Sequence, residues 1–248
     1  MARWLKYMKE RFPLVTYVLL SGAMCWSGAA LFQVSPFGTP IQTGLSMLGL
    51  LLFFFELRLM DEWKDFEKDK IAHPGRPLPR GLITPKEVRA VIGAGMSLMM
   101  AFTSALGFMH YPDAAGLYAA ITVYLWLMYK EFFIAESLAT KPFLYGFTHQ
   151  IILLPLMAFP VAIFHSKGWL QSSSLELGLT VLGAFFTYEL CRKLDPKAHP
   201  VLKNYPQVYG RGGTFFRITL TTATAMLGSS LLHIESVSVA PLMLTWLA

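Results

Sequence analysis

Charged residues are scarce in this chain. Only 15% of its 248 residues are Asp, Glu, Lys or Arg, whereas 54% are hydrophobic. A typical soluble domain carries about 25% charged residues, so the composition excludes an ordinary soluble protein. The sequence also lacks low-complexity tracts and any stretch polar enough to form a separate soluble domain. We therefore expect a single integral membrane domain that occupies residues 1–248.

Cysteine is equally rare. The chain has two cysteines, Cys25 and Cys191, which lie far apart and belong to no CxxC pair. This spacing excludes a cysteine-based zinc site and gives no basis for a structural disulfide. We expect both thiols to be reduced and buried.

What the sequence has instead is a series of long apolar runs. Only helices and closed barrels satisfy their backbone hydrogen bonds within a bilayer, and these runs are too long for barrel strands. They predict an all-α, polytopic bundle of seven or eight transmembrane helices, the eighth being the short run Val237–Ala248. No cleavable signal peptide is evident. The longer runs are Leu14–Val34, Ile41–Phe55, Val91–Phe108, Ala114–Tyr129, Phe143–Phe164, Leu175–Phe186 with an extension to Tyr188, and Ile218–Leu232.

Basic residues are almost absent from one side of the predicted bundle. If Leu14–Val34 is the first span, all of the 21 lysines and arginines except Lys167 lie at the N-terminus or in the three connections on the same side. The positive-inside rule places that side, and the N-terminus with it, in the cytoplasm. Topology thus explains the net charge of +6, and we expect no nucleic-acid partner.

The central stretches of the predicted spans lack Asp, Glu, Lys and Arg, which disfavours an ion-conducting path. His149 lies within the fifth span, where we expect an interior, hydrogen-bonded histidine. Two long charged loops, Asp61–Glu87 and Arg192–Arg211, are separated by four spans and therefore emerge on the same cytoplasmic face. Converging polar loops beside an apolar interior suit an amphiphile with a diphosphate head and a hydrocarbon tail.

Three aspartates follow the second predicted span. Asp61, Asp65 and Asp69 recur every four residues, which puts their carboxylates on roughly one helix face. Mg²⁺ prefers carboxylate oxygens and commonly completes its coordination with substrate phosphates, so these residues are candidate metal ligands. The alternative is a solvated helix end whose acids pair with Lys64 and Lys68.

A basic segment comes next in the same loop. Arg76 and Arg80 flank Pro77-Leu78-Pro79, which holds the backbone extended. The planar fork of arginine suits bidentate contacts with phosphate, so both residues are candidate diphosphate ligands. The alternative is the ordinary basic charge of a cytoplasmic loop.

Acids and bases also cluster in the other cytoplasmic connections. Glu189, Arg192 and Lys193 fall within about one helical turn at the end of the sixth span, and Asp195 follows. Lys130 lies in the short middle connection and is a further candidate phosphate ligand. The alternatives are a snorkelling basic helix end for the first group and an interfacial anchor for Lys130.

These motifs resemble the UbiA superfamily of intramembrane prenyltransferases. That family carries an Asn/Asp-x-x-x-Asp-x-x-x-Asp motif after its second helix, then an Arg-Pro-Leu-Pro-like segment, and an Asp-x-x-x-Asp motif after its sixth helix. Asp61, Asp65 and Asp69 match the first motif, and Arg76–Gly81 is similar to the segment that follows it. The four spans between the motifs agree as well, and the resemblance covers residues from about 14 to 235.

The chain departs from the family pattern in its second half. Asp195 is followed four residues later by His199 rather than Asp, and Tyr188-Glu189 resembles a Tyr-Asp pair of the family with an interval one residue shorter. The family usually has nine helices, more than we expect here. The resemblance implies that Asp195 binds metal together with the first motif, and that Asp65, Tyr188 and Glu189 are catalytic.

The resemblance further implies a Mg²⁺-dependent enzyme at the cytoplasmic face of the membrane, with a prenyl diphosphate and membrane lipid as partners. Arg76, Arg80, Lys130 and Lys193 would neutralise the diphosphate as it leaves an allylic prenyl chain. The expected reaction transfers the prenyl group to a lipophilic acceptor, either aromatic or lipid. Two alternatives stay open: terpene cyclisation of the prenyl diphosphate alone, and a non-catalytic membrane carrier of metal or lipid.

Overall fold

The computed structural model describes residues 2–195, 199–202 and 204–232, and every regular element within them is helical, as predicted. The predicted run Val237–Ala248 lies outside the described residues. The α-helices are α1 Ala2–Arg11, α2 Leu14–Ala30, α3 Pro40–Lys64, α4 Phe66–Ala72, α5 Pro85–Phe108, α6 Pro112–Tyr129, α7 Ala135–Ala139, α8 Pro142–Gln150, α9 Leu153–Phe164, α10 Ser172–Arg192 and α11 Tyr205–Leu231. The 3₁₀ helices are η1 Pro36–Gly38, η2 Glu131–Phe133, η3 Gly168–Leu170 and η4 Pro200–Leu202.

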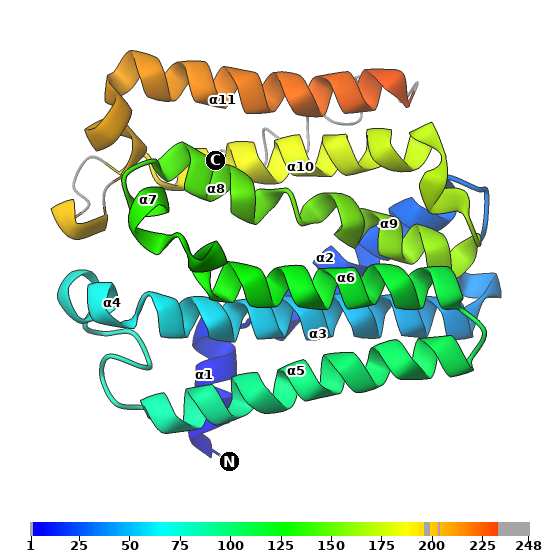
Figure 1. Ribbon diagram of the computed structural model, residues 1–248, viewed down its shortest axis with the longest axis horizontal. Coiled ribbons are helices and arrows are strands. Elements are labelled where there is room, and N and C mark those ends of the chain that lie inside the picture. Colours follow the sequence, from blue (N-terminus) through cyan, green and yellow to red (C-terminus); the bar gives the residue numbers. More distant parts are fainter. Residues whose placement is uncertain (1, 196–198, 203, 233–248) are drawn as a thin grey trace.

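The long helices lie side by side along the longest axis of the molecule (Figure 1). In the described residues each predicted apolar run lies largely within a helix, although Leu14–Val34 extends four residues beyond the end of α2, and α8 and α9 share the fifth run. In the described part of the chain, α3, α5, the α8–α9 pair and α10 are long and apolar enough to cross a membrane. The pair α1–α2, bent by 55°, would add another. The fold is that of an integral membrane protein, whereas the number of spans and the side of the N-terminus stay predictions.

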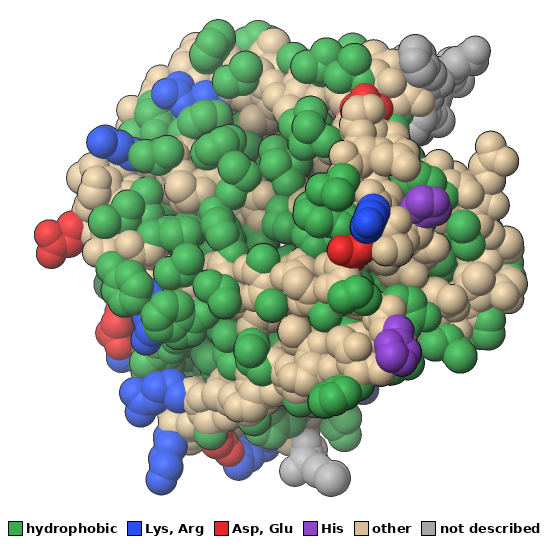
Figure 2. Space-filling model, turned by 45° about the vertical axis from the view of Figure 1, so that its right-hand side comes forward, with side chains coloured by type: hydrophobic (Ala, Val, Ile, Leu, Met, Phe, Trp, Pro, Cys, Tyr) green, Lys and Arg blue, Asp and Glu red, His purple; other side chains and the backbone are tan. Residues whose placement is uncertain are grey.

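Many large hydrophobic side chains are exposed on the outside of this bundle. Hydrophobic side chains cover much of the face shown in Figure 2, and most Lys and Arg side chains there lie toward one margin. On α11, Phe215 and Phe216 are 72% and 65% exposed. Large exposed aromatic side chains on successive helix positions suit contact with lipid rather than water.

Proline and a polar cap fix several helix starts. α3, α5, α6 and α8 each have proline in the first turn, where the missing N–H removes no intrahelical hydrogen bond. At the start of α5, the Glu87 N–H donates to Thr84 Oγ1 at 3.2 Å, and the Thr84 N–H donates to Glu87 Oε2 at 2.8 Å. This capping box ends the polar loop sharply where α5 begins.

Small residues let the helices approach closely. A Cβ atom at Gly49 of α3 would lie 2.6 Å from the ring of Phe159 in α9, and one at Gly183 of α10 would collide with the backbone of Ala225 in α11. Tyr118 of α6 donates its hydroxyl hydrogen to the Gly49 carbonyl oxygen at 2.8 Å. α3 therefore packs centrally against α6 and α9, while α10 and α11 form a closely packed pair.

The expectation that the spans lack ionisable residues in their interior is wrong for α3. This helix extends through Glu56 to Lys64, so Glu56 lies about 12 Å before its C-terminal end and inside the span. Glu56 is 1% exposed, and its two carboxylate oxygens have no hydrogen-bond partner among the described residues. The side chain fits because Gly95 of α5, directly opposite, has no Cβ atom. The interior of this span thus holds an ionisable group. The sequence did not indicate it because the apolar run ends at Phe55, one residue before Glu56.

The two charged loops meet at one end of the bundle. α4, α7 and the connection between α10 and α11 lie together at the left-hand end of Figure 1, and α4 contacts η4 within that connection. The predicted convergence of Asp61–Glu87 and Arg192–Arg211 is therefore confirmed for their described residues. This end of the molecule carries the candidate site.

Candidate active site

The first acidic motif keeps helical hydrogen bonding across the junction of α3 and α4. α3 ends at Lys64, yet the Asp65 N–H donates to the Asp61 carbonyl oxygen at 2.9 Å, and the Asp69 N–H donates to the Asp65 carbonyl oxygen at 2.8 Å. The three aspartates thus keep the one-turn spacing that the sequence indicates. Their environments differ, because the Asp61 side chain is 39% exposed and that of Asp69 only 2%.

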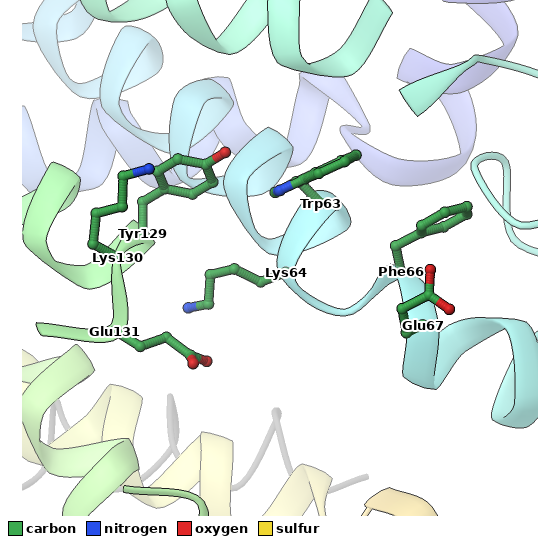
Figure 3. A pocket seen from close by; sticks show the side chains of 7 residues that line it. All are labelled: Trp63, Lys64, Phe66, Glu67, Tyr129, Lys130 and Glu131. Carbon is green, nitrogen blue, oxygen red and sulfur yellow. The ribbon is translucent and has the colours of Figure 1, made fainter. Parts of the chain in front are cut away.

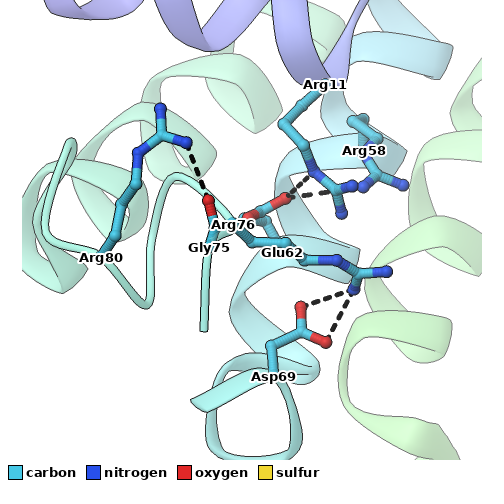
Figure 4. Close-up of polar contacts among 7 residues, drawn as sticks. All are labelled: Arg11, Arg58, Glu62, Asp69, Gly75, Arg76 and Arg80. Carbon is cyan, nitrogen blue, oxygen red and sulfur yellow. Dashed lines mark hydrogen bonds and ion pairs between the residues drawn. The ribbon is translucent and has the colours of Figure 1, made fainter. Parts of the chain in front are cut away.

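Asp69 faces the arginine segment. Nη1 of Arg76 donates to both carboxylate oxygens of Asp69, at 2.7 and 2.6 Å (Figure 4). A buried carboxylate needs such a partner, since an unpaired charge is costly to remove from water. The pair joins a predicted metal ligand to a predicted diphosphate ligand, and the two charges neutralise each other.

Arg80 points away from the aspartates. It donates to the Gly75 carbonyl oxygen at 2.8 Å (Figure 4) and pairs with Glu10 of α1, also at 2.8 Å. The hydrogen bond with Glu10 raises the pKa of Arg80. The structure therefore brings Arg76 to the first motif and places Arg80 at the contact between this loop and α1.

Glu189 gathers two cations at the end of α10. Its carboxylate oxygens pair with Arg192 and with Lys193, each at 2.6 Å. Asp61 of α3 lies near enough to Glu189 and Lys193 for their charges to act on it. The ends of α3 and α10 thus lie at the same end of the bundle (Figure 1), although they are far apart in the sequence.

The other predicted residues of the second motif lie at or beyond the end of α10. Tyr188 is 43% exposed, and the backbone carbonyl of Asp195 accepts a hydrogen bond from Asn204 Nδ2 at 3.2 Å. The exposed His199 accepts one at Nδ1 from the Val201 N–H, also at 3.2 Å. Asp195 and His199 therefore belong to the connection that contacts α4.

A cavity of about 450 Å³ lies beside the first motif (Figure 3). Lys130, the predicted phosphate ligand of the middle connection, is part of its wall, with Nζ 4.9 Å from the ring centroid of Tyr129. The wall combines two cations, two acids and three aromatic rings. The lining residues are Trp63, Lys64, Phe66, Glu67, Tyr129, Lys130 and Glu131.

Lys64, which the sequence indicated only as a possible ion-pair partner of the aspartates, is a member of this site. Its Nζ lies 3.0 Å from Nε2 of His149 in α8 and 3.9 Å from Oδ1 of Asp61. The expectation of a hydrogen-bonded interior histidine is confirmed, since Nδ1 of His149 lies 2.8 Å from the Tyr145 carbonyl oxygen. Lys64 and His149 are 85 positions apart, so no local pattern reveals their contact.

The carboxylates match Mg²⁺ in chemical type. Asp61 and Asp65 supply hard oxygen donors one helical turn apart, and Mg²⁺ takes few protein ligands when phosphates complete its coordination. With side chains placed as they are, no group of three His, Cys, Asp or Glu residues in the described part of the chain is arranged to hold a metal ion.

Comparisons with known proteins agree with the family resemblance that the sequence motifs indicate. The profile of the UbiA prenyltransferase family matches residues 15–248. No curated protein sequence matches the chain at a significant level. A solved structure concerned with digeranylgeranylglyceryl phosphate synthase in membranes is similar, with a TM-score of 0.66 and 15% sequence identity over 100% of this chain and 86% of that chain. At that identity the likeness concerns the fold alone.

Proposed function

The chain belongs to the UbiA prenyltransferase family, and from this we propose that it is a Mg²⁺-dependent enzyme that ionises an allylic prenyl diphosphate and transfers the prenyl group to a lipophilic acceptor. The family identifies the enzyme as a prenyltransferase. The metal, the acceptor and the roles of individual residues are the proposed part.

The observation that carries the proposal is the meeting of two acidic segments at one end of an apolar bundle. Asp61 and Asp65 lie at the end of α3, and Glu189 lies at the end of α10, where it pairs with Lys193. α4, which follows the end of α3, contacts η4 in the connection that follows α10. A prenyl diphosphate is highly charged at one end and apolar along its chain. The polar end of the bundle matches the head of such a substrate, and the interior matches its tail.

We assign metal binding to Asp61, Asp65 and Asp69 of the first motif and to Asp195 of the second, as the family pattern implies. When bound, Mg²⁺ would neutralise the diphosphate and so make it a better leaving group. Asp69 is paired with Arg76 in the substrate-free chain. An incoming diphosphate offers Arg76 another anion, which would free Asp69.

The cations of the chain would stabilise the departing diphosphate. Arg76, Lys130 and Lys193 would donate hydrogen bonds to phosphate oxygens as the allylic carbon–oxygen bond breaks. Glu189 holds Lys193 through the ion pair at 2.6 Å. Tyr188, which precedes Glu189 in α10, would contact the prenyl chain of the substrate. Exclusion of water by the apolar bundle would then protect the allylic cation until the acceptor captures it.

Arg80 takes a different role in this proposal from the one expected of it. Its guanidinium group is engaged by Glu10 and by the Gly75 carbonyl oxygen, one residue before Arg76. We therefore assign Arg80 to anchoring the segment that carries Arg76, and leave direct diphosphate binding to Arg76, Lys130 and Lys193.

The test uses the purified protein in lipid nanodiscs with Mg²⁺ and geranyl, farnesyl or geranylgeranyl diphosphate. Each diphosphate is supplied alone, with a phenolic acceptor or with a glycerol phosphate acceptor, the last because the fold neighbour is named for a glyceryl phosphate product. Release of diphosphate that depends on an acceptor supports prenyl transfer. Cyclic hydrocarbons formed without an acceptor would instead support a terpene cyclase. Absence of turnover, or equal turnover by Asp65→Asn, would contradict the proposal.

A further inference from the structure

The pair formed by Lys64 and His149 is not explained by either acidic motif. Lys64 is the last residue of α3, His149 lies in α8, and Nζ is 3.0 Å from Nε2. The Lys64 side chain is only 9% exposed. A nearly buried ammonium group needs hydrogen-bond partners, because an unpaired charge is costly away from water. His149 supplies the closest of those partners.

The surroundings of His149 determine which ring nitrogen accepts. Nδ1 lies 2.8 Å from the Tyr145 carbonyl oxygen, which can only accept, so Nδ1 carries the hydrogen. Nε2 then presents its lone pair to the Lys64 ammonium group. The imidazole also stacks on the Tyr145 ring, with centroids 4.2 Å apart and an interplanar angle of 18°. The acceptor for Lys64 is therefore held in a fixed orientation.

Lys64 keeps donor capacity for a ligand. Its ammonium group has three N–H donors, of which Nε2 of His149 takes one. Asp61 attracts the charge from 3.9 Å, beyond the length of a good hydrogen bond. The side chain extends into the cavity that it lines together with Lys130 and Glu131 (Figure 3). An anion in this cavity would meet two lysines from different parts of the chain.

We propose that Lys64 is a diphosphate-binding residue and that His149 is a positioning residue, which holds the Lys64 ammonium group at the cavity. The inference rests on the proposed function of this site and adds to it a cation outside the arginine segment. The lysine stem is long and flexible, so without His149 the ammonium group would turn toward the carboxylate of Asp61. The site would then lose a phosphate contact and the full use of a metal-binding carboxylate.

A matched pair of substitutions at His149 tests the positioning role. His149→Phe keeps a ring that can stack on Tyr145 but has no acceptor, whereas His149→Gln places an amide oxygen near the position of Nε2. We expect His149→Phe to weaken the binding of inorganic pyrophosphate with Mg²⁺, measured by calorimetry, about tenfold, and His149→Gln to restore most of it. In turnover assays KM for the prenyl diphosphate should rise with kcat less affected.

Lys64→Met should weaken pyrophosphate binding at least as much as His149→Phe, and the double variant should be no weaker than Lys64→Met alone. Lys68→Met is the control, because Lys68 is exposed on the neighbouring helix α4, and it should bind as the wild type does. Wild-type binding by His149→Phe, or additive losses in the double variant, would overturn the inference. Pyrophosphate binding without turnover of any prenyl diphosphate would contradict the proposed function instead.

Discussion

Nη1 of Arg76 lies 2.7 and 2.6 Å from the two carboxylate oxygens of Asp69, so one guanidinium nitrogen holds a carboxylate that is only 2% exposed. The pair links α4 to the Arg-Pro-Leu-Pro segment and restrains the loop between them. Both groups are proposed to serve the reaction, one at the metal and one at the diphosphate. The pair is thus the contact that we expect to open when substrate binds.

Replacement of Arg76 should separate these two roles. Arg76→Lys keeps the charge but loses the planar fork, so we expect kcat/KM for the prenyl diphosphate to fall about tenfold or more. Arg76→Ala also leaves Asp69 buried without its cation, and the melting temperature should fall as well. In the double variant with Asp69→Asn, stability should partly return while activity does not. Arg76→Lys with wild-type kcat/KM would contradict a role at the diphosphate.

The ion pair between Glu10 and Arg80 should matter to activity through the loop that it anchors. Both side chains are about one third exposed, so we expect only a modest loss, about two- to fivefold in kcat/KM, for Glu10→Gln or Arg80→Gln. The exchanged pair, Glu10→Arg with Arg80→Glu, should recover part of it. Arg3→Gln is the matched control, because Arg3 also belongs to α1 but pairs with Glu87 in the first turn of α5, at 2.9 Å, and not with the segment Arg76–Arg80. An equal loss in the control would show a general effect of α1.

Substitution by methionine should affect the stability of the protein in opposite ways at two buried acids of α3. Glu56 has no hydrogen-bond partner among the described residues, so Glu56→Met should leave the melting temperature unchanged or raise it. Glu62 is paired with Arg11 at 2.8 Å and with Arg58 at 3.6 Å, so Glu62→Met should cost about 1–3 kcal/mol of unfolding free energy. Thermal unfolding in one detergent compares the two variants directly. A larger loss for Glu56→Met than for Glu62→Met would show that Glu56 has a stabilising role.

The close approach of α10 and α11 predicts a sensitive glycine. A Cβ atom at Gly183 would collide with the backbone of Ala225, which cannot move as a side chain can, so Gly183→Ala should lower the melting temperature markedly. Gly93 of α5 faces open space, and Gly93→Ala should stabilise its helix by up to about 1 kcal/mol. Both variants replace one helical glycine with alanine, so a difference between their melting temperatures reports the helix contact. Similar melting temperatures would contradict the packing of α10 against α11.

Much of the fold could be predicted because the apolar runs are long and the backbone in a membrane has few options. The run Ile41–Phe55 indicated a helix, but α3 continues to Lys64. The apolar run ends before the first charged residue, Glu56, whereas the helix continues through charged residues that are buried or ion-paired. Glu56 and Glu62 show both outcomes: Glu56 is buried without a hydrogen-bond partner in the part of the chain that the structure describes, whereas Glu62 pairs with two arginines.

Only part of the candidate site could be predicted from the spacing of residues in the sequence. Asp61, Asp65 and Asp69 could be recognised because each is four residues from the next, and the structure keeps that spacing. The contact between Lys64 and His149 could not be predicted from the sequence, because it depends on how α8 lies against the end of α3. Local patterns place residues on one helix, whereas contacts between helices follow from packing.

The sequence by itself determined the class of this protein and indicated that its charged loops lie together at one end of the molecule. Long apolar runs must form helices in a membrane, and basic residues concentrate on one side of them. Only the tertiary structure decided which cation meets which acid at that end. In the structure Arg76 pairs with Asp69 and Arg80 pairs with Glu10, although both arginines lie in one short segment. The physical reason is that an ion pair forms over a few ångströms, and the packing of α1, α3 and α4 sets those distances.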